Sequence, residues 1–479
     1  MAHPRAIAIG IDAAEPTLVQ AQIESGALPV LGRLAGEGDW CRVKSPSDIG
    51  SGCVWPTFLT GTPALHHGIY SHQPWYADRM ESLPVDVSKL KPFWTRPPFD
   101  ERRVAILDVP FAPPGSPLEI LDWGSHDRIL GSMSCRPEEL LSLLKHVGQH
   151  PYARRPVDEW LPRDDSDLRR LVTRSSAGVR QHGALMAELL AGQSPEVLVA
   201  VFSEVHRASH VLWQTVDGRY AGTPLRDSLV SLLQEVDGQI GRVLEAAGPD
   251  TTVVVFSLHG MRAADGTPTL LGPLLTAAGY TVDPVTTPSA PSWPSRVQRA
   301  VRGAIPREVK HFFHRRLPAH VASRLRLPGP PLQQHDWSRT RAFEVFSDQH
   351  GWVRINLRGR EAQGIVSADE YEGLCSQLES WLGGLRNVAG VPVADRVFRT
   401  ASTIDEAMRS QLPDIVVHWN GTGSLGPIAV NGTIVDSPPV TAQITGQHSL
   451  DGFCLVRHPA SSHTIGSEIR AEEIHSLLI

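Results

Sequence analysis

The chain has 479 residues, of which 41% are hydrophobic and 20% charged, and its formal net charge is −6. A chain of this length can bury a large core and still carry an insertion over an active site. The ordinary composition and small net charge argue against a nucleic-acid-binding protein, so we expect no nucleic acid polymer as a partner.

The five cysteines are scattered without a CxxC pair, and their odd number argues against a disulfide framework. The apolar stretch at residues 6–10 is too short for a secretory signal segment, and we interpret it as a core strand. No apolar run approaches the roughly 20 residues that cross a bilayer. We therefore expect a cytoplasmic protein without a membrane partner; its oligomeric state is left open.

Short apolar runs rich in β-branched residues alternate with helix-period segments along most of the chain. This alternation is typical of a parallel sheet covered by helices on both faces, so we predict an α/β fold with a central, mostly parallel sheet. The predicted strands are residues 6–11, 103–107, 197–202 and 252–256, and the predicted helices are residues 15–24, 167–190, 226–247 and 368–385.

Two regions break the alternation, residues 71–166, rich in Pro and Trp, and residues 284–335, rich in Pro, Ser and Arg. We expect both to be caps or insertions on a single catalytic domain that spans residues 1–479. The stretch 294–327 within the second region is strongly basic. A solvated helical face explains it more simply than an anion-binding surface does.

Asp12 and Ser51 are the first two candidate site residues. Asp12 ends the first predicted strand, and ligands of open α/β sheets bind outside the carboxyl ends of the strands. Ser51 begins a predicted helical turn, where unpaired backbone N–H groups favour an anionic nucleophile and a bound phosphate. Taken alone, Asp12 could equally be a helix cap, and Ser51 is more simply an N-cap.

Histidines form the next set of candidates. Glu204, His206 and His210 follow a predicted strand directly, and two histidines four residues apart on a helix share one face and can hold a metal ion. His259 follows another predicted strand, and His448 lies in a glycine-flanked loop. Each histidine alone is more simply a core or surface residue, but their shared position after strands favours a metal site.

These motifs together resemble the type I phosphodiesterase / nucleotide pyrophosphatase family of the alkaline phosphatase superfamily, over most of the chain. Counting back from Thr60-Gly61 places the nucleophile of that family on Ser51, with Thr57 as a weaker alternative. The resemblance implies an alkaline-phosphatase-like fold. The matching segments are Gly10-Ile-Asp12, Leu28-Pro-Val-Leu-Gly-Arg-Leu34, His67-Gly-Ile69, His206-x-x-x-His210, Ser257-Leu-His-Gly-Met261 and His448.

The resemblance implies two metal sites about 4 Å apart, and both depart from the family pattern here. The first site would use Asp12, Ser51 and His259, but Leu258 replaces its fourth ligand, an Asp. We expect this site to be weakened, because a hard anionic ligand is lost.

In the other site, His206 replaces the usual Asp and joins His210 and His448. Three imidazoles with an open fourth position suit a catalytic zinc ion. We therefore expect one strong divalent metal site, most simply zinc, and one uncertain site to which Glu204 could contribute a substitute ligand.

The function implied by the resemblance is metal-dependent hydrolysis of a phosphoester, of the phosphodiesterase or nucleotide pyrophosphatase type. Ser51 would attack phosphorus and form a phospho-enzyme intermediate. The expected partner is a small phosphate or sulfate ester, for example a nucleotide. Two alternatives stay open: a phosphoryl or sulfuryl transferase or sulfatase-like enzyme of the same superfamily, and a non-catalytic member that only binds a ligand.

Overall fold

A nine-stranded sheet, with the strand order β19-β2-β18-β9-β1-β8-β5-β6-β7, is the core of the computed structural model. Strands β9, β1, β8, β5 and β6 run parallel, whereas β18 and β7 are antiparallel to their neighbours β9 and β6. The bounds are β1 Ala6–Ile11, β2 Asp39–Lys44, β5 Val104–Leu107, β6 Leu118–Leu121, β7 Ser134–Arg136, β8 Val197–Phe202, β9 Thr252–Ser257, β18 Asp451–Arg457 and β19 Glu468–Arg470. The structure describes residues 3–124, 133–152, 164–216, 225, 227–264, 270–284, 335–347, 349–421, 425–436, 444–459 and 465–479.

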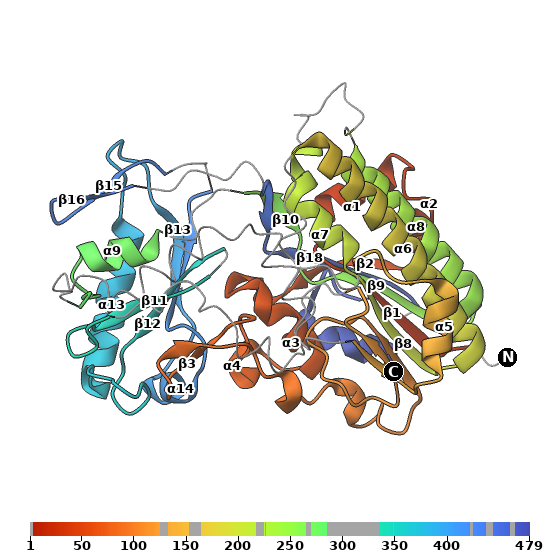
Figure 1. Cartoon of the computed structure of the whole chain (residues 1–479), viewed down its shortest axis with the longest axis horizontal. Helices are drawn as coiled ribbons and strands as arrows, with labels where there is room; N and C mark the ends of the chain where they lie inside the picture. The colour runs from red at the N-terminus through yellow and green to blue at the C-terminus, as the bar shows by residue number, and fades with distance from the viewer. Residues whose placement is uncertain are drawn as a thin grey trace, which may run out of the picture.

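Both faces of this sheet are buried. In β1, Ile7 and Ile9 belong to one hydrophobic cluster and Ala6 and Ala8 to another, because successive side chains of a strand point to opposite faces. Long helices pack on the first face, including α6 and α8, as the right half of Figure 1 shows. The helices beside the sheet are α1 Pro16–Glu24, α2 Pro29–Glu37, α3 Val54–Thr60, α4 Ala64–His67, α5 Leu140–Val147, α6 Asp165–Gln193, α7 Glu204–Leu212 and α8 Ser228–Ala247.

A second, four-stranded antiparallel sheet with the order β11-β12-β14-β13 lies beside the first and has its own hydrophobic core (Figure 1). Its long helix α13 begins with a capping box between Ser367 and Glu370, which satisfies backbone donors of the first turn. We call this part the small-sheet region. Its elements are α9 Leu271–Ala277, β11 Ala342–Val345, β12 Gly351–Ile355, α13 Ala368–Gly384, β13 Ala394–Arg399, α14 Ile404–Arg409, β14 Ile415–Trp419, β15 Ile428–Val430 and β16 Thr433–Val435.

Two short antiparallel strand pairs lie outside the two sheets. Strands β3 (Trp75–Tyr76) and β4 (Glu81–Ser82) pair in the segment after α4. Strands β10 (Met261–Ala263) and β17 (Gly446–His448) pair at the edge of the central sheet, where Met261 lies opposite His448. Among the residues with described positions, no helix is long and apolar enough to cross a membrane.

The predicted α/β class and central parallel sheet are confirmed, and all four predicted strands and all four predicted helices correspond to observed ones within three residues. The prediction that residues 71–166 form a cap is wrong for much of that region, because β5, β6 and β7 belong to the central sheet. The sequence pattern predicted β5, but Pro- and Trp-rich connections obscured the short strands β6 and β7. Most of the predicted insertion at 284–335, including the basic stretch 294–327, lies outside the described residues.

Candidate active site

Three neighbouring parallel strands bring the first candidate residues to one edge of the sheet. The register pairs Ile11 of β1 with Phe202 of β8, and Gly10 of β1 with Phe256 of β9. The carboxyl ends of these strands therefore lie side by side, which is where open α/β sheets bind ligands. Asp12 follows β1 directly, and His259 follows β9 after one intervening residue.

The structure brings together His206, His210 and His448. His206 and His210 lie one turn apart on α7, and β17 brings His448 to them through its pairing with β10. His206 Nε2 lies 3.0 Å from His210 Nε2 and 2.7 Å from His448 Nε2. One nitrogen from each of the three rings lies within 4.8 Å of the others, a spacing that could hold a metal ion.

The hydrogen bonds on the far side of these rings decide what the cluster can bind. His206 Nδ1 lies 2.6 Å from Asp12 Oδ2, and His210 Nδ1 lies 3.0 Å from the carbonyl oxygen of Gly446. The backbone carbonyl and the ionised carboxylate both accept, so each Nδ1 carries a proton. In a neutral ring, Nε2 then presents a lone pair. Two lone pairs that face each other at 3.0 Å repel unless a cation lies between them.

This donor set therefore fits a divalent ion. A histidine ligand typically donates its other ring N–H to a carboxylate or a backbone carbonyl, which fixes the tautomer and orients the ring. Asp12 does this for His206, and Gly446 does it for His210. Three neutral imidazoles are a ligand set that zinc accepts, with a fourth position left for substrate or water.

Ser51 begins the short 3-10 helix Ser51–Cys53, which continues directly into α3. The segment is tied to the site by Trp55, whose Nε1 donates to Asp12 Oδ1 at 3.0 Å. Gly10 permits this approach, since a Cβ there would lie 2.8 Å from the Trp55 ring. Thr57 is buried, and its hydroxyl is paired with His67 Nε2 at 2.9 Å, so it is poorly placed as a nucleophile.

The sequence profile of the family described as type I phosphodiesterase / nucleotide pyrophosphatase matches residues 6–371. The chain belongs to this family. It is accordingly a phosphohydrolase of the alkaline phosphatase superfamily. A search of curated proteins gave no significant match.

Solved structures of similar fold include the phosphonoacetate hydrolase from Sinorhizobium meliloti 1021 in complex with phosphonoformate. Its alignment has a TM-score of 0.56 and 15% sequence identity, and it covers 99% of this chain and 95% of the hydrolase chain. At this identity the likeness shows the fold, which is alkaline-phosphatase-like. Human ectonucleotide pyrophosphatase / phosphodiesterase 5 aligns with a TM-score of 0.46 and 10% identity over 99% of this chain and 93% of that one.

Asp12, Leu258 and His259 stand where the resemblance predicts the first of the two metal sites. Leu258 is fully buried in a hydrophobic cluster and offers no ligand. Asp12 already accepts one hydrogen bond on each oxygen, from Trp55 and His206, and His259 Nε2 lies 3.8 Å from Asp12 Oδ1. These residues do not supply a full second ligand set.

Glu204, the predicted substitute ligand, points away from the three histidines. Its Oε1 lies 2.9 Å from His150 Nε2 and 2.6 Å from His182 Nδ1. The reason is helical geometry, because residues two apart on a helix face different sides, so Glu204 cannot share the face of His206. The structure thus corrects this part of the sequence-based prediction.

The surroundings of Glu204 form a buried network that sequence patterns did not indicate. His182 Nε2 lies 2.8 Å from Asp108 Oδ2, and the backbone N–H of Tyr152 donates to His150 Nδ1 at 3.2 Å. Although burial opposes a charge on His182, Glu204 and Asp108 raise its pKa to about 10. A protonated His182 donates from both nitrogens, and a neutral His150 donates from Nε2, so these two rings are satisfied by Glu204 and Asp108 without a metal ion.

The small-sheet region holds the loop that precedes Ser51. His350 Nε2 donates to the carbonyl of Ser47 at 3.1 Å, His418 Nε2 to that of Asp48 at 2.6 Å, and Trp352 Nε1 to that of Ile49 at 2.7 Å. Three successive carbonyls of this loop therefore accept side-chain donors from β12, β14 and the residue before β12. Gln349 Nε2 also donates to the backbone carbonyl of His448 at 2.6 Å.

Proposed function

We propose that the protein is a metal-dependent phosphoester hydrolase with one strong metal site, made of His206, His210 and His448. The observation that carries this proposal is the convergence of their Nε2 atoms, with distances of 3.0 and 2.7 Å, while Nδ1 of His206 and of His210 is fixed by an acceptor. Zinc is the ion that three neutral imidazoles suit best. The cytoplasmic location stays a prediction from the sequence.

A divalent ion at this site supplies Lewis-acid polarisation of a phosphoryl oxygen. The chain's own part is nucleophilic attack by the Ser51 hydroxyl oxygen on phosphorus, which releases the ester alcohol with the serine proton and leaves the phosphoryl group on Ser51. Water then displaces this group from the serine and restores its hydroxyl. Ser51 lies at the N-terminal end of a helical segment, where the backbone dipole favours negative charge on the nucleophile and on the transferred group. Side-chain hydrogen bonds to the carbonyls of the loop Ser47–Ile49 help to position Ser51.

Activity measurements test the nucleophile. Wild-type protein and Ser51→Ala are assayed with bis-p-nitrophenyl phosphate, p-nitrophenyl phosphate and p-nitrophenyl sulfate, with Ser142→Ala, an exposed serine on α5, as the matched control. We expect turnover of at least one phosphate ester by wild type and by the control, and its loss in Ser51→Ala. Equal turnover in all three proteins would contradict the role of Ser51, and turnover of the sulfate alone would favour the sulfatase-like alternative.

A further inference from the structure

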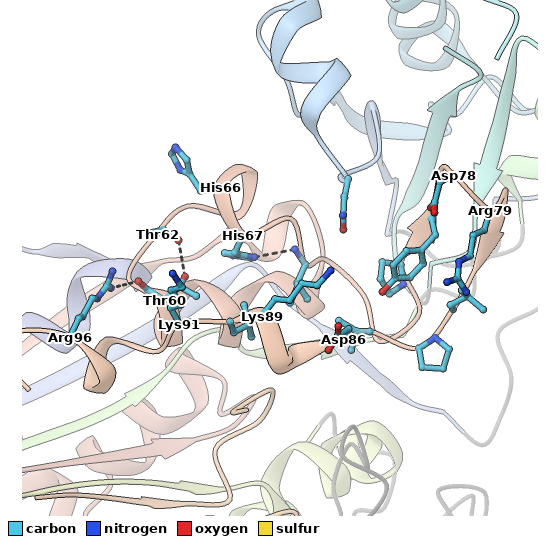
Figure 2. Close-up of a pocket in the computed structure, with 18 residues that line it drawn as sticks. Thr60, Thr62, His66, His67, Asp78, Arg79, Asp86, Lys89, Lys91 and Arg96 are labelled. Atoms are coloured by element: carbon cyan, nitrogen blue, oxygen red, sulfur yellow. Dashed lines mark hydrogen bonds between the residues drawn. The ribbon is translucent and has the colours of Figure 1, made fainter. Parts of the chain in front are cut away.

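A cavity of about 760 Å³ lies beside the C-terminal end of α3 and shares no residue with the three-histidine site (Figure 2). Its walls come from the turn between α3 and α4, the β3–β4 hairpin and the segment at residues 83–96, with Gln411 from the small-sheet region. The seven-residue helix α3 separates Thr60, in the cavity wall, from the Ser51 end, a length of about 10 Å at the usual rise per residue. The volume is within the range of small-molecule sites.

The lining of this cavity has an excess of positive charge. Four cations, Arg79, Lys89, Lys91 and Arg96, face two carboxylates, so the excess is two in a chain whose net charge is −6. Within the part of the chain that the structure describes, none of the four forms an ion pair. Arg96 is held in place, because its guanidinium donates to the carbonyl of Thr60.

One wall is a fixed, uncharged surface. Burial lowers the pKa of His67 to about 4, so this ring is neutral near pH 7. Its Nδ1 accepts from the backbone N–H of Ile69 at 3.1 Å, which places the proton on Nε2, paired with the hydroxyl of Thr57. The positive potential therefore comes from the lysines and arginines, and their concentration in a concave site focuses it on a bound ligand.

Apolar side chains make up much of the remaining lining, including Ile69, Leu83, Val85 and Leu90. A ligand that fits these walls has an anionic group for the cations and a flat or aliphatic body for the apolar surface. We propose that this cavity is a second binding site, for a small molecule that bears a phosphate or phosphonate group. The site is independent of the metal centre, so it stands whether or not the proposed catalytic function holds.

Calorimetric titration with phenylphosphonate tests the proposal on the full chain, treated with EDTA to remove metal from the histidine site. The test variant is Lys89→Gln/Lys91→Gln, and the matched control is Lys44→Gln/Lys145→Gln, which removes two exposed lysines far from the cavity lining. We expect saturable binding to wild type and to the control, and an increase in Kd of about tenfold or more in the test variant, because two charge-assisted contacts are lost.

Arg79→Gln, on the β3–β4 hairpin, is a second test variant and should also weaken binding. Thermal unfolding midpoints close to wild type establish that the variants are folded. The proposal is overturned if wild type shows no saturable binding, or if both lysine pairs give the same Kd. Benzoate, which has the same ring and a single charge, should bind more weakly than phenylphosphonate; equal affinity would rule out the preference for a phosphorus-containing anion.

Discussion

The Asp12 carboxylate accepts hydrogen bonds on both oxygens, from Trp55 Nε1 and from His206 Nδ1. In the family pattern this residue is a metal ligand, but here a histidine stands at position 206 and an aliphatic side chain at position 258. We therefore expect the Asp12 carboxylate to orient His206, a ligand in the proposed metal site.

Asp12→Asn should reduce the affinity for zinc by about 10- to 100-fold, because the neutral amide is a weaker acceptor for the His206 N–H and makes its imidazole less basic. The affinity is measured by competition with a chromogenic chelator. Asp100→Asn, which changes an exposed carboxylate away from the site, is the control. An affinity equal to wild type in Asp12→Asn would argue against the orienting role.

The His182 imidazole gives a prediction for pH dependence. Its pKa of about 10 in the folded protein lies above the usual value near 6.5, so its contribution to stability is full below about pH 6.5 and is lost as pH rises through about 10. The free energy of unfolding, measured with urea between these limits, should fall with pH more steeply in wild type than in His182→Gln. Parallel curves for the two proteins would contradict a charged His182.

The sequence pattern identifies Asp12 and His259, which come just after apolar strands, and His206 and His210, which lie in the first turns of the helix after another strand. It could not find His150 and His182, since one lies in a loop and the other in the middle of a 29-residue helix. Their partnership with Glu204 depends on tertiary contacts between segments up to 54 residues apart in sequence.

At the scale of elements, the small-sheet region fixes the loop before Ser51 through side-chain hydrogen bonds. The His350 and His418 rings stack with a centroid distance of 4.2 Å and, with Trp352, donate to consecutive carbonyls of the loop. All three side chains are buried. The two sheets are thus joined at the place where the proposed nucleophile is positioned.

Trp352→Phe tests this connection, because it keeps an aromatic ring near Tyr70 and removes the N–H that reaches Ile49, together with part of the buried indole ring. An unsatisfied buried carbonyl costs about 1–3 kcal/mol, so we expect a lower unfolding free energy together with a fall in kcat. Zinc content should stay at the wild-type level. Trp337→Phe, a half-buried tryptophan of the same region, is the control, and an equal kcat in both variants would contradict the positioning role.

For the whole molecule, the sequence predicted the central sheet well because its inner strands are short apolar runs buried on both faces. It did not predict the small-sheet region as a separate layer. Strand β12 pairs with β14, which lies far along the chain, for example Gly351 with Val417, and a local pattern carries no information on such pairing.

Among the described residues, the proposed metal site is the group His206, His210 and His448 at the carboxyl edge of the central sheet, whereas Asp12 and His259 do not supply a full ligand set. The metal content of purified protein, measured by inductively coupled plasma mass spectrometry, tests this most directly. Wild type, His259→Gln and the exposed-histidine control His146→Gln should each retain one tightly bound ion per chain, and His210→Gln should lose it. The proposed single site would be contradicted by two bound ions in wild type. It would also be contradicted if His210→Gln kept its ion and His259→Gln lost it.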